Sequence, residues 1–250
     1  MIFNASYVLA KREVVRFFRQ RSRVMGAILT PVLFWLFLGY GFGKSFQNDS
    51  FQGGYQAYFF PGVLLMVLMF TSIFSMISLI EDRREGFLQT VLISPSSRMN
   101  IVAGKVVGTG VIAVIQTVMV SLLAPFAGFQ LTVVMLAKIV LLSLLISFQM
   151  ALFGFLLAWR SRSIQGFHVL MNLILMPMWM LSGATFPVEG ASSWIAFLMK
   201  LNPLTYANTL LQSVFFEVDL GYSLYITLFL VLLFFVGSVA QIQQKRKEVG

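Results

Sequence analysis

The densest charge in this chain lies in one short run, which holds three of the nine acidic side chains beside two arginines: Glu81, Asp82, Arg83, Arg84 and Glu85. Read as a helix, the residues that follow place an apolar strip beside the charged patch: Phe87, Leu88, Val91 and Leu92. Such side chains suit charge-assisted hydrogen bonds and apolar anchoring to another protein. The pattern predicts an amphipathic docking helix over Glu81–Val91. The alternative, a solvated charged loop, does not account for the apolar strip.

Other residue types that carry chemistry are scarce. The chain has no cysteine and a single histidine, His168, which makes neither a zinc site nor a proton relay. Gly104 and Lys105 are followed by Val106 and lack the upstream glycine of a phosphate-binding loop, so they form no ATP site. We expect no catalytic residue, no metal and no cofactor bound by this chain.

The composition predicts an integral membrane protein. Of 250 residues, 58% are hydrophobic and 11% are charged, and the mean hydropathy is +0.87. About 20 helical residues cross a hydrocarbon core of about 30 Å. Six stretches are long enough: Val24–Gly43, Ala57–Ile80, Val106–Phe129, Val133–Trp159, Phe167–Pro187 and Tyr222–Ala240. The sequence therefore predicts an all-α membrane protein with six transmembrane helices in residues 24–240.

The charges predict how the chain is oriented. With the N-terminus in the cytoplasm, 15 of the 18 basic residues lie on that side, including the tail 241–250, and only Lys44, Lys138 and Lys200 lie outside. We expect a multi-pass protein of the cell inner (plasma) membrane with both termini cytoplasmic. The net charge of +9 then reports topology and contact with lipid, not nucleic acid.

The acidic residues exclude two classes of membrane protein. All nine are expected outside the six stretches, whereas proton-coupled carriers and intramembrane metalloenzymes need carboxylates at membrane depth. Any uphill transport must therefore draw its energy from another polypeptide.

Residues 1–23 are expected to form an amphipathic helix in the plane of the interface. Its apolar face is predicted from Phe3, Tyr7, Ala10, Val14, Phe17 and Phe18, and its opposite face from Arg12, Arg16, Arg19 and Arg23. Such a helix serves as a topology anchor or as a partner-docking surface.

Several motifs occur in an order that resembles one family. They are Phe60-Pro61-Gly62, the run from Glu81 to Leu88, Ser94-Pro95-Ser96-Ser97-Arg98, Gly104-Lys105, Leu181–Pro187 and Leu201–Ala207. Together they are similar to the type-2 permease family of ATP-binding-cassette (ABC) exporters, over almost the whole chain.

The resemblance implies partners and roles. The permease would be a homodimer, or a pair with a close relative, held by two cytoplasmic ATPase subunits that bind ATP and Mg. Glu81–Val91 would be the coupling helix, with Arg83, Arg84 and Glu85 at the polar contact and Phe87 and Leu88 as apolar anchors. Val188–Gly221 would form extracytoplasmic re-entrant helices, although an interfacial belt with Trp194 and Tyr206 fits equally.

Soft apolar surfaces suit a substrate path for hydrophobic compounds, although methionine more often simply packs. The candidates lie in the second and fifth spans: Met66, Met69, Phe70, Ile73, Asn172, Met176 and Met180. We expect a permease subunit that exports a drug-like or lipid-like compound. The alternatives are an exporter of lipid-linked polysaccharide and a membrane scaffold that recruits a cytoplasmic partner.

Overall fold

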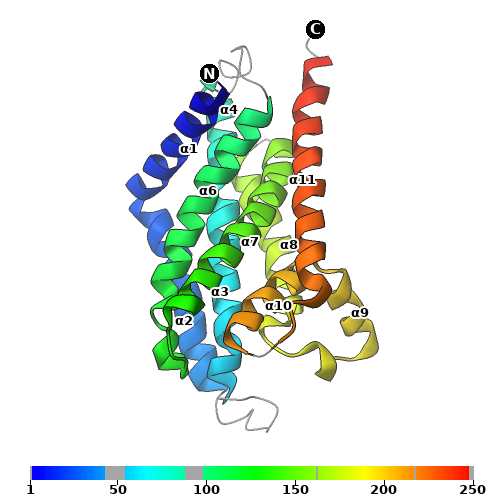
Figure 1. Cartoon of the computed structure of the whole chain (residues 1–250). Helices are drawn as coiled ribbons and strands as arrows, with labels where there is room; N and C mark the ends of the chain where they lie inside the picture. The colour runs from blue at the N-terminus through cyan, green and yellow to red at the C-terminus, as the bar shows by residue number, and fades with distance from the viewer. Residues whose placement is uncertain (1, 43–53, 88–97, 162, 217, 248–250) are drawn as a thin grey trace.

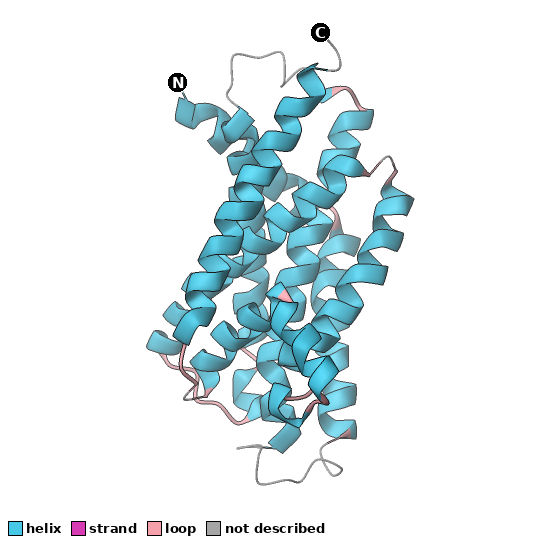
Figure 2. Ribbon diagram, turned by 90° about the vertical axis from the view of Figure 1, so that its right-hand side faces the viewer, coloured by secondary structure: helices cyan, strands magenta, loops and turns pink. Residues whose placement is uncertain are grey.

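The computed structural model describes residues 2–42, 54–87, 98–161, 163–216 and 218–247, and every regular element among them is helical (Figure 2). The long helices are α1 (Ile2–Arg19), α2 (Arg21–Gly41), α3 (Gly54–Ser75), α4 (Ile77–Arg84), α6 (Arg98–Ser121), α7 (Val133–Arg160), α8 (Ile164–Trp179), α9 (Ser193–Leu201), α10 (Pro203–Phe215) and α11 (Gly221–Lys247). Short turns of helix complete the fold: η1 (Ala124–Ala127), the π-helix η2 (Met180–Ala184) and η3 (Val188–Gly190).

Six of these helical segments in the described residues are long and apolar enough to cross a membrane, which confirms the predicted all-α, six-span fold. They are Arg21–Gly41, Gly54–Arg84, Met99–Ser121, Val133–Arg160, Ile164–Ala184 and Gly221–Gln243. The start of α1 and the end of α11 lie at the same end of the bundle, which we call the N-terminal end (Figure 1).

Three span boundaries differ from the sequence expectation by four residues or more, among them the end of the third span, which is Ser121 instead of Phe129. The second helical segment continues to Arg84, because α4 follows α3 after a break at one residue, Met76. The third begins at Met99 instead of Val106. Glu81 and Asp82 therefore lie in the last turn of the helical segment that contains the second span, and their position outside the hydrocarbon core stays a prediction.

The core of the bundle lies around α3. In its most apolar window 94% of the residues are buried, compared with 22% in α2, 22% in α8 and 17% in α11. Aromatic side chains pack around α3: Phe59 packs edge to face against Trp179, and Phe60 packs edge to face against Trp35. Since α3 is apolar on all sides, it can be buried on all sides.

The fifth span is broken at η2, and neighbouring helices satisfy the backbone groups that the break frees. Gly183 adopts a positive φ of 79°, and Tyr58 Oη donates to its carbonyl at 2.6 Å. From the other side, Asn202 Nδ2 donates to Met178 O at 2.5 Å and Thr205 Oγ1 donates to Leu181 O at 3.3 Å. Irregular backbone at membrane depth is tolerated where protein buries it, and here α10 and its N-cap do so.

The segment expected to be re-entrant, 188–221, contains η3, α9 and α10, and it covers the end of the bundle opposite to the N-terminus (Figure 1). Trp194 in α9 is exposed, whereas Tyr206 in α10 is partly buried and donates to Lys200 O at 2.5 Å. Helices are thus present where the sequence predicts them, and their re-entrant role stays a prediction.

The face of α1 that packs on the bundle includes only part of the predicted apolar face. Leu9, Glu13 and Phe17 are buried, whereas Tyr7 is 68% and Phe18 is 39% exposed. Of the expected apolar face, Phe17 is thus packed inside the chain, while Tyr7 and Phe18 are exposed, and their contact with lipid stays a prediction. The helix is turned so that Glu13 faces the bundle, where a basic side chain meets it.

Gly62 provides a test of how closely the fifth span packs on α3. A Cβ atom at Gly62 would lie 2.6 Å from Ala184 Cβ, whereas one at Gly26 in α2 would meet no atom within 4 Å. We expect Gly62→Ala to cost about 1–3 kcal/mol by overpacking and Gly26→Ala to change stability little. Thermal unfolding of the two variants in detergent measures this, and equal unfolding midpoints would contradict the close approach.

Candidate functional site

The charged run predicted as a docking helix forms the end of a spanning helix. α4 begins at Ile77, four residues before the predicted start, and ends at Arg84; Gly86 then turns the chain with a φ of 76°. Glu81, Asp82, Arg83, Arg84, Glu85 and Phe87 are all described. Leu88 and Val91 lie outside the described residues.

Asp82 is completely buried and is bound by three cations. Its Oδ1 accepts hydrogen bonds from Arg12 Nη2 and Arg16 Nη1, each at 2.8 Å, and its Oδ2 accepts one from Lys105 Nζ at 2.6 Å. The bond to Asp82 raises the pKa of the Arg12 guanidinium above its ordinary value. Side chains of α1 and α6 thereby bind the same carboxylate of α4.

Lys105 is equally buried and also contacts α1. Its ammonium group donates to Glu13 Oε1 at 2.8 Å and to Ser78 Oγ at 2.9 Å, and Ser78 donates to Glu13 Oε2 at 2.6 Å. Lys105 and Glu13 are 2% and 3% exposed. A buried ion costs several kcal/mol unless it is paired and hydrogen-bonded, and each buried ion here has an oppositely charged partner.

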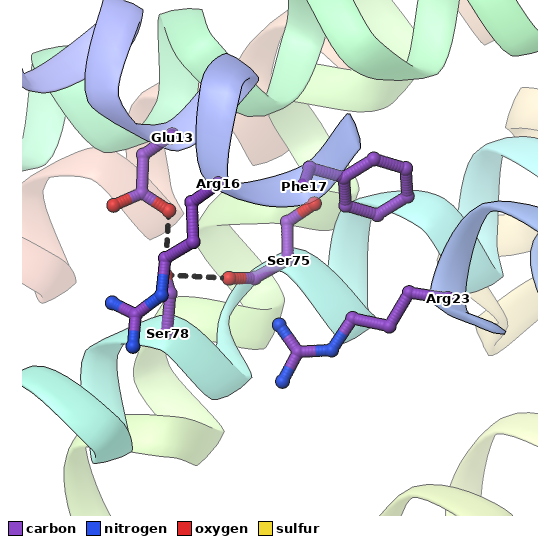
Figure 3. Close-up of a pocket in the computed structure, with 6 residues that line it drawn as sticks. All are labelled: Glu13, Arg16, Phe17, Arg23, Ser75 and Ser78. Carbon is purple, nitrogen blue, oxygen red and sulfur yellow. Dashed lines mark hydrogen bonds between the residues drawn. The ribbon is translucent and has the colours of Figure 1, made fainter. Parts of the chain in front are cut away.

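An outer layer of ion pairs surrounds this centre. Glu81 pairs with Arg16 at 2.9 Å and with Arg23 at 2.8 Å, and Arg16 also lies 3.6 Å from Glu85. We refer to the set Arg12, Glu13, Arg16, Arg23, Ser78, Glu81, Asp82 and Lys105 as the charge cluster. Figure 3 shows four of its members, Glu13, Arg16, Arg23 and Ser78, with Glu13 bonded to Ser78 and Ser78 bonded to Ser75. The cavity there has a volume of about 10 Å³, about the space of one water molecule.

Two glycines let α1 approach α6 closely enough for these contacts. A Cβ at Gly104 would lie 2.8 Å from Leu9 Cβ, and one at Gly108 would lie 2.8 Å from Ala10 O. Small residues four positions apart on a helix allow such close backbone contact. Gly104, which resembles part of a nucleotide loop in the sequence, therefore acts as a packing residue beside Lys105.

Arg83 points to the other side of α4. Its Nη2 donates to Trp159 O at 2.8 Å and its Nη1 donates to Ser161 O at 3.1 Å, so it satisfies carbonyls at the end of α7. Its guanidinium also lies 5.1 Å from the ring of Trp159. Arg83 was expected at a polar contact with a partner. Its two Nη donors instead bind carbonyls within this chain.

Of the predicted docking residues, Arg84 and Glu85 are exposed. The ring of Phe87 is partly buried, because the Arg12 guanidinium lies 3.9 Å from its centroid. The structure therefore leaves Arg84 and Glu85 available at the tip of α4 and places Phe87 against α1. The ATPase-coupling role of the whole set stays a prediction.

The candidate substrate-path residues do not share one surface. Met66, Met69 and Ile73 have no exposed area, and Phe70 is 9% exposed, because they belong to the central helix α3. Asn172 on α8 and Met180 at the start of η2 are exposed, and Met176 on α8 is partly buried. Any path along α8 therefore excludes direct contact with the α3 group in this conformation.

The charge cluster as a unit was not predicted from the sequence. Arg12 and Arg16 were expected on the face of the N-terminal helix opposite to its apolar side, and Lys105 was considered only as part of a phosphate-binding loop and of the family motif. Two signals were present: Glu13 lies between Ala10 and Phe17 on one side of a helix, and Gly104 and Gly108 are four residues apart. Within the described part of the chain, no group of acidic or histidine side chains could hold a metal ion.

Lys105 is the residue on which the cluster depends. Lys105→Gln leaves two buried carboxylates without their shared cation, so we expect a loss of about 3–5 kcal/mol in stability. The control is Lys11→Gln, which removes an exposed lysine from α1 and should have little effect.

The double variant Glu13→Gln, Lys105→Gln removes a cation and a carboxylate together and should recover part of the loss. Unfolding in detergent, followed by fluorescence, measures all three variants. A Lys105→Gln protein as stable as Lys11→Gln would show that the ion pairs contribute nothing.

Comparison with known proteins gives a consistent result. A profile of the family described as ABC-2 type transporter matches residues 4–216. The chain is 29% identical to a putative transport permease ycf38 of Cyanophora paradoxa over 88% of this chain and 82% of that protein. It is 24% identical to the probable multidrug ABC transporter permease YbhR of Escherichia coli, over 65% of this chain and 45% of that protein. A daunorubicin resistance ABC transporter permease protein, DrrB1 of Streptomyces coeruleorubidus, is 22% identical over 79% of this chain and 70% of that protein.

Proposed function

Because the chain belongs to the ABC-2 type transporter family, we propose that it is the permease subunit of an exporter that a separate ATPase drives. The ATPase would bind ATP and Mg, since this sequence contains no phosphate-binding loop. The permease would carry a hydrophobic or amphipathic compound, drug-like or lipid-like, out of the cytoplasm or the inner leaflet. The names of YbhR and DrrB1, which refer to multidrug transport and daunorubicin resistance, support this substrate class.

The tip of α4 is the proposed docking surface for the ATPase. The observation that carries this proposal is the division of its charges: Asp82 is bound inside the bundle, while Arg84 and Glu85 next to it are exposed. A rigidly anchored helix end with exposed charged groups can receive a partner and transmit its movement. Because Asp82 binds both Arg12 of α1 and Lys105 of α6, we infer that α1, α4 and α6 move as one body.

A second permease protomer would cover α8. This helix belongs to a span in which only 22% of the most apolar window is buried, yet it exposes His168 and Asn172 one turn apart. Polar side chains at membrane depth normally face protein or a water-filled cavity. A homodimer in which the two α8 faces border the substrate path would meet that requirement.

Arg84→Glu tests the docking surface. The charge reversal lies on an exposed side chain, so folding should be unaffected, while binding of the cognate ATPase should fall by at least about tenfold if Arg84 meets an acidic group there. Arg160→Glu, at the exposed end of α7, is the matched control and should bind normally. Co-purification and ATP hydrolysis of the complex in nanodiscs measure both.

Equal binding by wild type and Arg84→Glu, with equal hydrolysis, would refute the docking surface. The remaining explanation would then be a solvated end of α4.

Orientation is tested separately. We expect the N-terminal end of the bundle to face the cytoplasm, because most basic residues lie there. In intact cells a cysteine at the exposed position Glu189 should react with an impermeant maleimide, whereas one at Met99, 54% exposed at the start of α6, should not. The reverse labelling pattern would invert the topology.

A further inference from the structure

A groove of about 320 Å³ lies between the start of α7 and the end of α10. Its polar lining comes from Gln130, Thr132 and Lys138, and apolar side chains such as Phe129, Met135 and Phe215 complete it. The Thr132 hydroxyl is already used, because it accepts a hydrogen bond from Met135 N at 3.2 Å as the N-cap of α7. Lys138 and Gln130 are exposed and supply the groups free to bind a ligand.

Lys138 is unusual in its depth. It lies five residues after the start of a spanning helix, which is about 7.5 Å along the axis at 1.5 Å per residue. On the same face, one turn before and one turn after it, Val134 is 66% and Leu141 is 68% exposed. On this exposed face of α7 a cation therefore lies among apolar side chains.

The described residues give the Lys138 ammonium group neither an ion pair nor a hydrogen bond. A lysine near the end of a spanning helix extends its stem along apolar surface until its charge reaches the headgroup layer. The abundant anion in that layer is the phosphate of a phospholipid. Met135 and Phe215, on the wall of the groove, offer apolar surface for the glycerol backbone and the first methylenes of an acyl chain.

We propose that this groove binds the headgroup phosphate of an anionic phospholipid, with Lys138 as the cation that recognises it and Gln130 as the second polar contact. The groove lies at the end of the bundle opposite to the N-terminus, so the lipid belongs to the leaflet at that end. The site does not depend on the proposed transport activity, and its test needs no ATPase.

The test measures lipid preference at the groove itself. The chain contains no cysteine, so Val134→Cys provides one site for a bimane fluorophore at the rim. The labelled protein is reconstituted in bilayers containing brominated phosphatidylglycerol or brominated phosphatidylcholine, which quench the fluorophore on contact. We expect association with phosphatidylglycerol to be about fivefold stronger, the ratio that corresponds to about 1 kcal/mol for a basic residue near an anionic surface.

Variants of Lys138 test whether this side chain causes the preference for phosphatidylglycerol. Lys138→Gln should reduce the ratio to about one, and Lys138→Arg should retain it, because a guanidinium also binds phosphate. Lys200→Gln is the matched control, since Lys200 is an exposed lysine in α9 that does not line the groove. An unchanged ratio in Lys138→Gln would overturn the proposal.

Two further experiments test whether an anion other than the lipid headgroup binds Lys138. Glu217 follows Phe215 by two residues in the sequence, and Glu217→Gln should leave the ratio unchanged. A rise in the ratio would show that this carboxylate, not lipid, is the counter-ion of Lys138. Millimolar inorganic phosphate should not compete, and loss of the preference in its presence would show that the site takes a free anion.

Discussion

The ammonium group of Lys105 lies between the carboxylates of Glu13 and Asp82, and the arrangement of three helices depends on this contact. Lys105 belongs to α6, Glu13 to α1 and Asp82 to α4, so a single cation joins segments that are 92 and 23 residues away along the chain. None of the three groups can be buried alone at tolerable cost. Each of these helices is therefore fixed by the presence of the other two.

The position of this cluster has a functional consequence. A purely apolar contact would allow helices to slide, whereas paired buried charges favour one register, a role attested for some buried polar groups. The same helix end that is fixed by Asp82 exposes Arg84 and Glu85, and on its other side Arg83 satisfies carbonyls of α7. A force applied to the tip of α4 would therefore reach α1, α6 and α7 through short polar contacts. This is the physical basis of the proposed coupling to an ATPase.

The sequence was sufficient to predict the spanning helices. It was insufficient to predict which side of each helix is buried. Long apolar stretches identify membrane helices because every backbone group there must be bonded within the helix. Periodicity then fails for α3, which is apolar on every side, so the sequence left open whether Met66 and Met69 pack in the core or line a substrate path. It also misleads for α1, where the buried face carries Glu13 and the exposed face carries Tyr7. The partner of Glu13 is Lys105. The spacing of Gly104 and Gly108 indicates a close helix contact, but a single sequence does not reveal that α1 is the helix that packs there.

The most direct test of the account is whether α1 and α4 move as one body during ATP turnover. The absence of cysteine allows pairs of spin labels at Lys11 and Arg84, and at Arg84 and Gln165 at the start of α8, in the permease bound to its ATPase. Pulsed electron resonance gives each distance without nucleotide and with ATP trapped. The account predicts an unchanged distance between Lys11 and Arg84 while the distance between Arg84 and Gln165 shifts. A shifted or broadened distance between Lys11 and Arg84 would contradict it.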